Sequence, residues 1–238
     1  MRSAGRGQSL PTVGIDVACS ETKRLPLCFV GYRGRRLVPL SIPSELRERI
    51  PRGLGNAEIK SKYPFRSRAA AVGRALERIS DECGWNIECV AIDAPAAPPQ
   101  HGPRSCEREL SEAQISCYYT PDRGEWVRIK DECRRYLGAG KPLSGMPNAN
   151  RIWMLYGFEL FRALRALGVS VIETYPQAIV RHLLGDDCPT KLAKSGHSIQ
   201  LGAVARATGW NPALLKTHCR PLVQVTATTD LMRSWPLG

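Results

Sequence analysis

Three acidic residues lie at or near the ends of short apolar stretches of this sequence. Asp16 follows Val-Gly-Ile, Asp93 follows Val-Ala-Ile, and Glu173 follows Val-Ser-Val-Ile. A carboxylate at such a position is costly to bury unless it is paired or binds a metal ion. Carboxylates gathered from separate strands repel one another, and a divalent cation commonly holds such a group together. The three acids therefore indicate a site for Mg²⁺ or Mn²⁺ at one edge of a sheet.

The chemistry expected of such a site is the hydrolysis of a phosphodiester. Two hard cations about 3.5–4 Å apart activate a water molecule and stabilise the leaving oxygen in many nucleases. We expect Asp16 to bridge the cations, because the pattern makes its strand central, and Asp93 and Glu173 to complete the site. Each acid also has a purely structural interpretation. The two aspartates suit turns, and Glu173 precedes a helix beginning near Pro176, whose dipole favours an acid there by about 0.3–1 kcal/mol.

Strand patterns dominate the first part of the chain. Residues 13–18, 25–32 and 37–42 are apolar and rich in β-branched side chains, and the basic turn at residues 33–36 joins the last two. This spacing predicts three consecutive antiparallel strands. Prolines and glycines interrupt residues 43–65, which we interpret as a short helix and a basic loop.

Helical spacing governs most of the remainder. Helices are predicted over residues 66–83, 105–113, 152–167, 176–184 and 195–208. Strands are predicted at residues 87–94 and 169–172, each directly after a helix. Because a long crossover permits parallel pairing, we expect the first and fourth strands to be parallel neighbours. The pattern therefore predicts an α/β fold with a mixed central sheet flanked by helices.

The loops near Asp93 are the expected place of the site. Prolines and glycines make residues 95–103 a helix-free loop, and α/β sheets bind ligands beyond the carboxyl ends of their strands. Residues 116–148 are predicted to be an irregular basic loop insertion. Aromatic and cationic side chains alternate there, namely Tyr118, Tyr119, Trp126, Lys130, Arg134, Arg135 and Lys141. Such a mixture either stacks bases and holds phosphates or forms a partly buried loop with a solvated face.

Composition and charge limit the class of protein. The chain has 238 residues and a formal net charge of +12, from 34 lysines and arginines against 22 acids. This charge suits a polyanionic partner such as nucleic acid, although a basic protein need not bind one. No apolar run reaches the ~18 residues of a membrane span, and no signal peptide is recognisable. We expect a cytoplasmic protein with a flexible lead-in at residues 1–11 and a single domain over residues 12–238.

The cysteines predict neither a disulfide framework nor a zinc site. Nine of them are scattered along the chain without a Cys-x-x-Cys pair. We expect them to be reduced, small core residues. His101 and Cys106 are close in sequence but are too few for a tetrahedral zinc site.

Four short motifs carry a resemblance to a known family. Residues 14–18, 91–95, 104–110 and 172–176 together resemble the predicted-nuclease family called domain of unknown function 429, over roughly residues 12–208. The resemblance implies a ribonuclease H-like fold. It also implies that Asp16, Asp93 and Glu173 occupy the positions of the acidic metal site. Arg104 and Glu107 fall on a further motif of possible supporting role, and the alternative for both is an exposed helix surface.

The C-terminal part departs from the family pattern. The resemblance implies a terminal helix with a fourth acid, whereas residues 212–238 have a poor helical pattern in which Asp230 is the candidate. Asp186 and Asp187 are nearer Glu173 in sequence but are predicted to lie in a loop. Without a fourth acid the metal site would be incomplete, and the chain would be a degenerate or truncated relative.

Two other classes of function stay open. An actin- or sugar-kinase-like nucleotide-binding enzyme also has an Asp-bearing first strand followed by small and hydroxyl residues, here residues 20–23. The absence of an internal repeat and of a Gly-rich phosphate loop argues against that class. A non-catalytic nucleic-acid-binding or interaction domain would keep the basic surface and would not depend on a metal.

Overall fold

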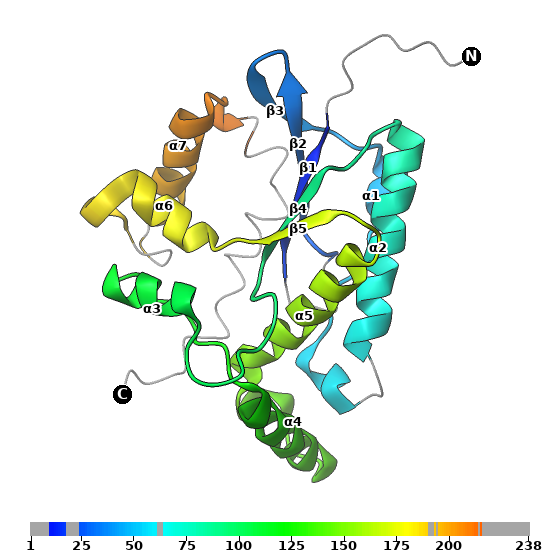
Figure 1. The fold of residues 1–238 in the computed structure, drawn as a ribbon, viewed down its shortest axis with the longest axis vertical. Coiled ribbons are helices and arrows are strands. Elements are labelled where there is room, and N and C mark those ends of the chain that lie inside the picture. The colour runs from blue at the N-terminus through cyan, green and yellow to red at the C-terminus, as the bar shows by residue number, and fades with distance from the viewer. Residues whose placement is uncertain are drawn as a thin grey trace.

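The computed structural model describes residues 10–17, 24–60, 64–189, 193, 195–213 and 215. These residues form an α/β fold built on one five-stranded sheet with helices on both sides (Figure 1). The strands are β1 (Thr12–Asp16), β2 (Leu27–Arg33), β3 (Arg36–Leu40), β4 (Cys89–Asp93) and β5 (Ser170–Glu173). Their order in the sheet is β3-β2-β1-β4-β5.

The sheet is mixed, as the sequence predicts. Strands β1, β2 and β3 pair antiparallel, and β1 then pairs in parallel with β4, which pairs in parallel with β5. Gly34 turns the β2–β3 hairpin with a φ of +63°, a conformation that glycine adopts without strain. The first strand is therefore central, with the crossover through a helix placing β4 beside it.

The helices follow the sequence pattern with one exception, and short 3₁₀ turns lie in segments predicted to be loops. The helices are α1 (Ser44–Glu48), α2 (Pro64–Cys83), α3 (Ser105–Glu112), α4 (Arg123–Gly138), α5 (Ile152–Arg165), α6 (Pro176–Leu184) and α7 (Gly196–Thr208). The 3₁₀ turns are η1 (Asn56–Lys60), η2 (Leu143–Gly145), η3 (Ala149–Arg151) and η4 (Gly185–Asp187). Within the described ranges, none of the helices has the length and hydropathy that crossing a membrane requires.

The hydrophobic core lies between the sheet and the α2–α5 pair, which Figure 1 shows on one side of the sheet, with α6 and α7 on the other. Alternate residues of β1 and β4 face this core, and Val13, Ile15, Val90 and Ile92 are at most 3% exposed. The intervening residues of both strands are only partly buried. Because Asp16 and Asp93 belong to the second set, both aspartates point away from the core.

The exception is the segment predicted to be an irregular basic loop. Residues 123–138 form the helix α4, which begins at Asp122, whose carboxylate accepts a hydrogen bond from the Glu125 backbone N–H at 2.8 Å. Its buried side chains follow helical spacing, namely Trp126, Ile129, Cys133 and Leu137. The prediction was wrong because charged residues separate these four and obscure the stripe. Trp126 is a core residue and does not offer a ring for stacking bases.

The cysteine prediction holds only in part. Cys133 is fully buried, whereas Cys106 is exposed, and Cys28, Cys83, Cys89, Cys117 and Cys188 are partly buried. None of these seven cysteines forms a disulfide. Cys19 and Cys219 lie outside the described residues.

A glycine in α5 fixes the position of the end of β4. A Cβ atom added at Gly157 would lie 2.5 Å from the Cβ atom of Ala94, closer than two carbon atoms can pack. Ala94 directly follows Asp93. The absence of a side chain at Gly157 therefore lets α5 approach the strand end that carries the candidate acid.

Candidate active site

The strand register brings Asp16 and Asp93 together. Each is the last residue of its strand, and the two are partners in the parallel β1–β4 ladder. Partners in parallel strands point to the same face of a sheet whose strands lie about 4.8 Å apart. Two partly buried aspartates thus extend side by side from the carboxyl edge of the sheet.

Glu173 reaches the same edge in a different register. It ends β5 and is the partner of Ile92, one residue before Asp93. Since successive side chains alternate between the faces of a sheet, Glu173 leaves its strand on the opposite side from Asp93. The backbone N–H of Thr174 continues the ladder to the Ile92 carbonyl at 2.9 Å, which places Thr174 next to Asp93.

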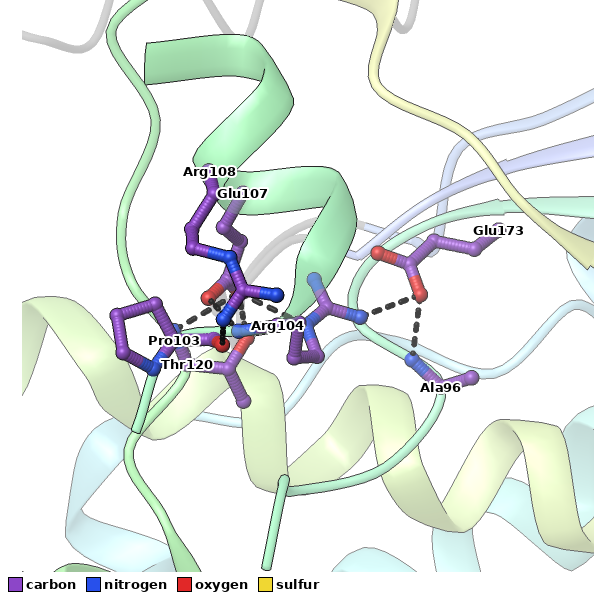
Figure 2. A network of polar contacts seen from close by, with 7 residues as sticks. All are labelled: Ala96, Pro103, Arg104, Glu107, Arg108, Thr120 and Glu173. Atoms are coloured by element: carbon purple, nitrogen blue, oxygen red, sulfur yellow. Dashed lines mark hydrogen bonds and ion pairs between the residues drawn. The ribbon is translucent and has the colours of Figure 1, made fainter. Parts of the chain in front are cut away.

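Arg104 holds the carboxylate of Glu173 (Figure 2). The Glu173 Oε2 atom accepts a hydrogen bond from Arg104 Nη1 at 2.7 Å and another from the Ala96 backbone N–H at 3.0 Å. Both bonds end on Oε2, so Oε1 accepts no hydrogen bond from the residues that the structure describes. The Glu173 side chain is 31% exposed, so Arg104 neutralises a carboxylate that solvent still reaches.

Glu107 is the buried partner of the same arginine. Its Oε1 atom accepts hydrogen bonds from Arg104 Nε at 2.8 Å, from the Thr120 backbone N–H at 2.9 Å and from the Thr120 hydroxyl. Its Oε2 atom accepts a hydrogen bond from the Arg104 backbone N–H at 3.2 Å, and this contact caps the start of α3. The side chain is only 2% exposed, so the surface interpretation of Glu107 is wrong. The 104–107 motif ties α3 to the loop at Thr120 and orients Arg104 toward Glu173 (Figure 2).

The charges of this network reinforce one another. Burial opposes the charge of Arg104, but hydrogen bonds and Coulomb attraction from Glu173 and Glu107 outweigh it and raise the pKa of the guanidinium. Burial also raises the pKa of Tyr175, with smaller contributions from Cys117, Asp93 and Tyr118. The pKa of Cys117 is likewise raised, chiefly by burial and then by Glu107. At neutral pH, Arg104 is therefore a cation, and the phenol and thiol beside it are uncharged.

A pocket of about 310 Å³ opens beside these groups. Its polar lining comes from Asp93, Glu173, Arg104 and Glu107, together with the backbone and side chains of neighbouring loop residues. Its apolar lining includes the rings of Tyr118, Trp153 and Tyr175. The pocket thus lies between the ends of β4 and β5, the helix α3 and the first turn of α5.

A second hollow, of about 650 Å³, lies along α4 and α5, and we call it the basic groove. Its charged lining consists of Arg123, Lys130, Arg162 and Arg165 with the single acid Glu159. The loop that follows Asp93 contributes to both hollows, since Pro95 lines the pocket and residues 96–98 line the basic groove. A group of basic side chains therefore lies close to the acidic edge, separated from it by the loop that follows Asp93.

Some candidate residues lie elsewhere. Asp230 and residues 20–23 are outside the described residues. Asp186 and Asp187 lie in the turn η4, and both are exposed. Over the described ranges, no three or more His, Cys, Asp and Glu side chains are grouped so that they could hold a metal ion. The adjacent donors are the two aspartates, which fits a Mg²⁺ ion that is bound by one or two carboxylates together with substrate phosphates. Glu173 is not grouped with them, because it leaves β5 on the opposite side and is bonded to Arg104.

The fold and site define an α/β protein with a mixed sheet and an acidic carboxyl edge. Residues 61–233 match the family described as protein of unknown function (DUF429), so the chain belongs to that family. The matched segment contains Asp93, Arg104, Glu107 and Glu173, whereas Asp16 precedes it. Searches of the curated proteins and of the solved structures found no match to the chain.

Sequence reasoning missed several residues of the site. Thr120 contacts Glu107 from 13 positions away, and Trp153 was assigned only to a helix. Thr120 follows Tyr119 in the segment predicted to be an irregular loop, where no helical or strand spacing indicated a buried residue. The hydroxyl of Tyr175 donates to the Ser116 carbonyl, 59 positions away, at 2.5 Å. Contacts over such separations leave no local signal in one sequence.

Proposed function

We propose that this protein is a divalent-metal-dependent nuclease of ribonuclease H-like fold that hydrolyses phosphodiester bonds of nucleic acid. The observation that carries the proposal is the in-register pairing of Asp16 with Asp93 at the carboxyl edge of the sheet. The order of the strands, with an antiparallel meander followed by parallel strands, supports the assignment of the fold.

The acids and the cation have different roles in the proposed reaction. When bound, Mg²⁺ or Mn²⁺ supplies water activation and charge neutralisation at the phosphodiester. Asp16 and Asp93 would hold the cation through adjacent carboxylates, while Glu173 would hold Arg104 at the edge of the site. Since Mg²⁺ often relies on one or two carboxylates plus substrate oxygens, binding is strongest when nucleic acid is present.

The basic groove supports nucleic acid as the substrate. Four cations line it against one acid, and Glu159 already forms an ion pair with Arg162 at 2.9 Å. The remaining cations, Arg123, Lys130 and Arg165, bind backbone phosphates without regard to sequence. The groove shares the loop after Asp93, so a strand held there passes the acidic edge.

One observation favours a second candidate, a non-catalytic nucleic-acid-binding domain. Glu173 already has a cationic partner in Arg104, at 2.7 Å. A carboxylate that is neutralised in this way is a weaker ligand for a second cation. In such a domain the acids would be structural, and the basic groove would provide the activity.

Calorimetric titration with Mn²⁺ distinguishes the two candidates. The wild type, Asp16→Asn and Asp93→Asn are titrated with and without an oligonucleotide, and labelled DNA and RNA substrates are assayed in parallel. We expect both variants to lose metal binding and cleavage, and the control Asp186→Asn, an exposed acid in η4, to keep both. A wild type that binds nucleic acid with salt dependence, but neither binds Mn²⁺ nor cleaves, would establish the second candidate.

A further inference from the structure

The pocket beside Asp93 has the size of a site for one small planar group. Its volume of about 310 Å³ is near the lower end of the ~300–1,000 Å³ typical of small-molecule sites. It is separate from the basic groove, because residues 94 and 95 line the pocket whereas residues 96–98 line the groove. The two hollows are therefore suited to different parts of one ligand.

The charge of the pocket excludes a phosphate from its interior. Its lining includes the carboxyl groups of Asp93, Glu107 and Glu173 and a single cation, Arg104. Both glutamates are already bonded to that cation. In the absence of a bound cation, an anion entering the pocket would meet an excess of negative charge, so a neutral group is favoured over a phosphate.

Three aromatic side chains supply flat contact surface. The Trp153 indole N–H donates to the Asn150 carbonyl at 2.8 Å, and the Tyr175 hydroxyl donates to the Ser116 carbonyl. Backbone carbonyls therefore satisfy both polar groups, and neither needs a hydrogen bond from a ligand in the pocket. Tyr118 also lines it and is 53% exposed. Stacking on such rings tolerates any base, because every base has a π-face.

Arg104 supplies hydrogen-bond donors for the edge of the bound group. A guanidinium has five N–H bonds, and the contacts with Glu107 and Glu173 engage Nε and Nη1. The other N–H groups of Arg104 suit the carbonyl and ring-nitrogen acceptors of a nucleobase. The pocket thus combines stacking surface with a donor of fixed orientation.

We propose that this pocket binds one unstacked nucleobase, and that the substrate therefore presents an unpaired or flipped-out nucleotide next to the scissile phosphate. The inference rests on the proposed nuclease function and names the substrate class of that site. Enzymes that take a base out of the stack hold it in this way, between apolar rings and near convergent polar groups.

The first test uses neutral nucleosides, which carry no phosphate and need no metal. Adenosine, guanosine, cytidine and uridine are titrated calorimetrically into the full chain in the presence of EDTA. We expect binding by the wild type that Tyr118→Ala weakens by about 5- to 100-fold, because a stacked base contributes roughly 1–3 kcal/mol. The matched control is Tyr119→Ala, since Tyr119 is also exposed, at 45%, but does not line the pocket. It leaves the affinity unchanged.

A second variant fills the pocket instead of emptying it. Cys106 is exposed and lines the pocket, so Cys106→Trp introduces a bulky ring without disturbing the core. We expect this variant to lose nucleoside binding while its thermal unfolding matches that of the wild type. No binding of any nucleoside by the wild type, or equal losses in Tyr118→Ala and Tyr119→Ala, would overturn the inference.

Cleavage assays separate this inference from the proposed function. With Mn²⁺, a single strand should be cut faster than a fully paired duplex of the same sequence, and Tyr118→Ala should reduce this preference. Equal cleavage of both substrates, unaffected by Tyr118→Ala, would overturn the base pocket and leave the nuclease proposal intact. Nucleoside binding that depends on Tyr118, without metal-dependent cleavage of any substrate, would support the pocket and overturn the nuclease proposal.

Discussion

Two pairs of acids lie near the carboxyl edge of the sheet, and they are organised differently. Asp16 and Asp93 are adjacent because β1 and β4 pair in register, and both are partly buried. Glu107 and Glu173 lie on either side of Arg104, which bonds to both. We call the first pair the strand-end aspartates and the second group the arginine network. Strand pairing sets the spacing of the first, whereas ion pairs and hydrogen bonds set that of the second.

The difference leads us to expect different roles for the two pairs of acids. Glu107 is buried and accepts four hydrogen bonds, from Arg104 and Thr120. It has little capacity for another ligand and a large role in stability. Backbone pairing sets the positions of the strand-end aspartates, and both are only partly buried. Glu173 belongs to the arginine network through its Oε2 atom.

Removing Glu107 should have the largest effect on stability. Glu107→Ala leaves Arg104 and Thr120 without their buried acceptor, and breaking a buried pair in this way costs about 3–5 kcal/mol. Urea unfolding measures the loss of unfolding free energy. The control is Glu109→Ala, an exposed acid on α3, which should change that free energy by less than about 0.5 kcal/mol. Equal effects of the two substitutions would show that the network does not stabilise the fold.

Displacing the strand end should have the next largest effect. Gly157→Ala forces α5 and the residue after Asp93 apart, and overpacking of this kind costs about 1–3 kcal/mol. Since the shift moves Asp93 relative to the network, we expect nuclease activity to fall along with the melting temperature. Gly138→Ala is the control, because a Cβ atom there meets nothing within 4 Å. A Gly157→Ala protein with wild-type stability would show that the contact relaxes without cost.

Changing a strand-end aspartate should affect stability least in the absence of metal. We expect Asp93→Asn to shift the unfolding free energy by less than about 1 kcal/mol, since the amide keeps the shape of the side chain. With Mn²⁺ the two proteins should differ, because a cation that binds only the folded state raises its melting temperature. Thermal unfolding with and without Mn²⁺ measures this. A stabilisation by Mn²⁺ that survives in Asp93→Asn would place the cation away from the aspartates.

Alkaline pH should slightly lower the free energy of unfolding, through two groups beside the arginine network. Burial raises the pKa of Tyr175 and of Cys117, so the folded state retains these protons more tightly than the unfolded chain. This contribution is complete below the unfolded pKa values and disappears as pH rises through the higher folded values. Urea unfolding at pH 7 and at about pH 10 should show lower stability at the higher pH. Tyr175→Phe should reduce the loss, and an equal loss in both proteins would contradict the assignment to Tyr175.

Much of the fold was predictable because its signals are local. A few neighbouring residues determine each of three features: the hairpin at Gly34, the apolar alternation around Asp16 and the helix that begins at Pro176. The helix α4 was missed because its four buried residues are dispersed among charges. The helical periodicity of apolar residues is easy to recognise only where charged residues do not dominate the composition of the segment.

The sequence by itself determined the α/β class, the mixed sheet and the central place of the strand that carries Asp16. These follow from hydrophobic periodicity and from the crossover that parallel pairing requires. Only the tertiary structure decided the register that sets Asp16 beside Asp93 but Glu173 beside Ile92, and the contacts of Arg104 with both glutamates. Register and long-range contacts depend on how distant segments pack, and an offset of one residue sends a side chain to the opposite face of the sheet.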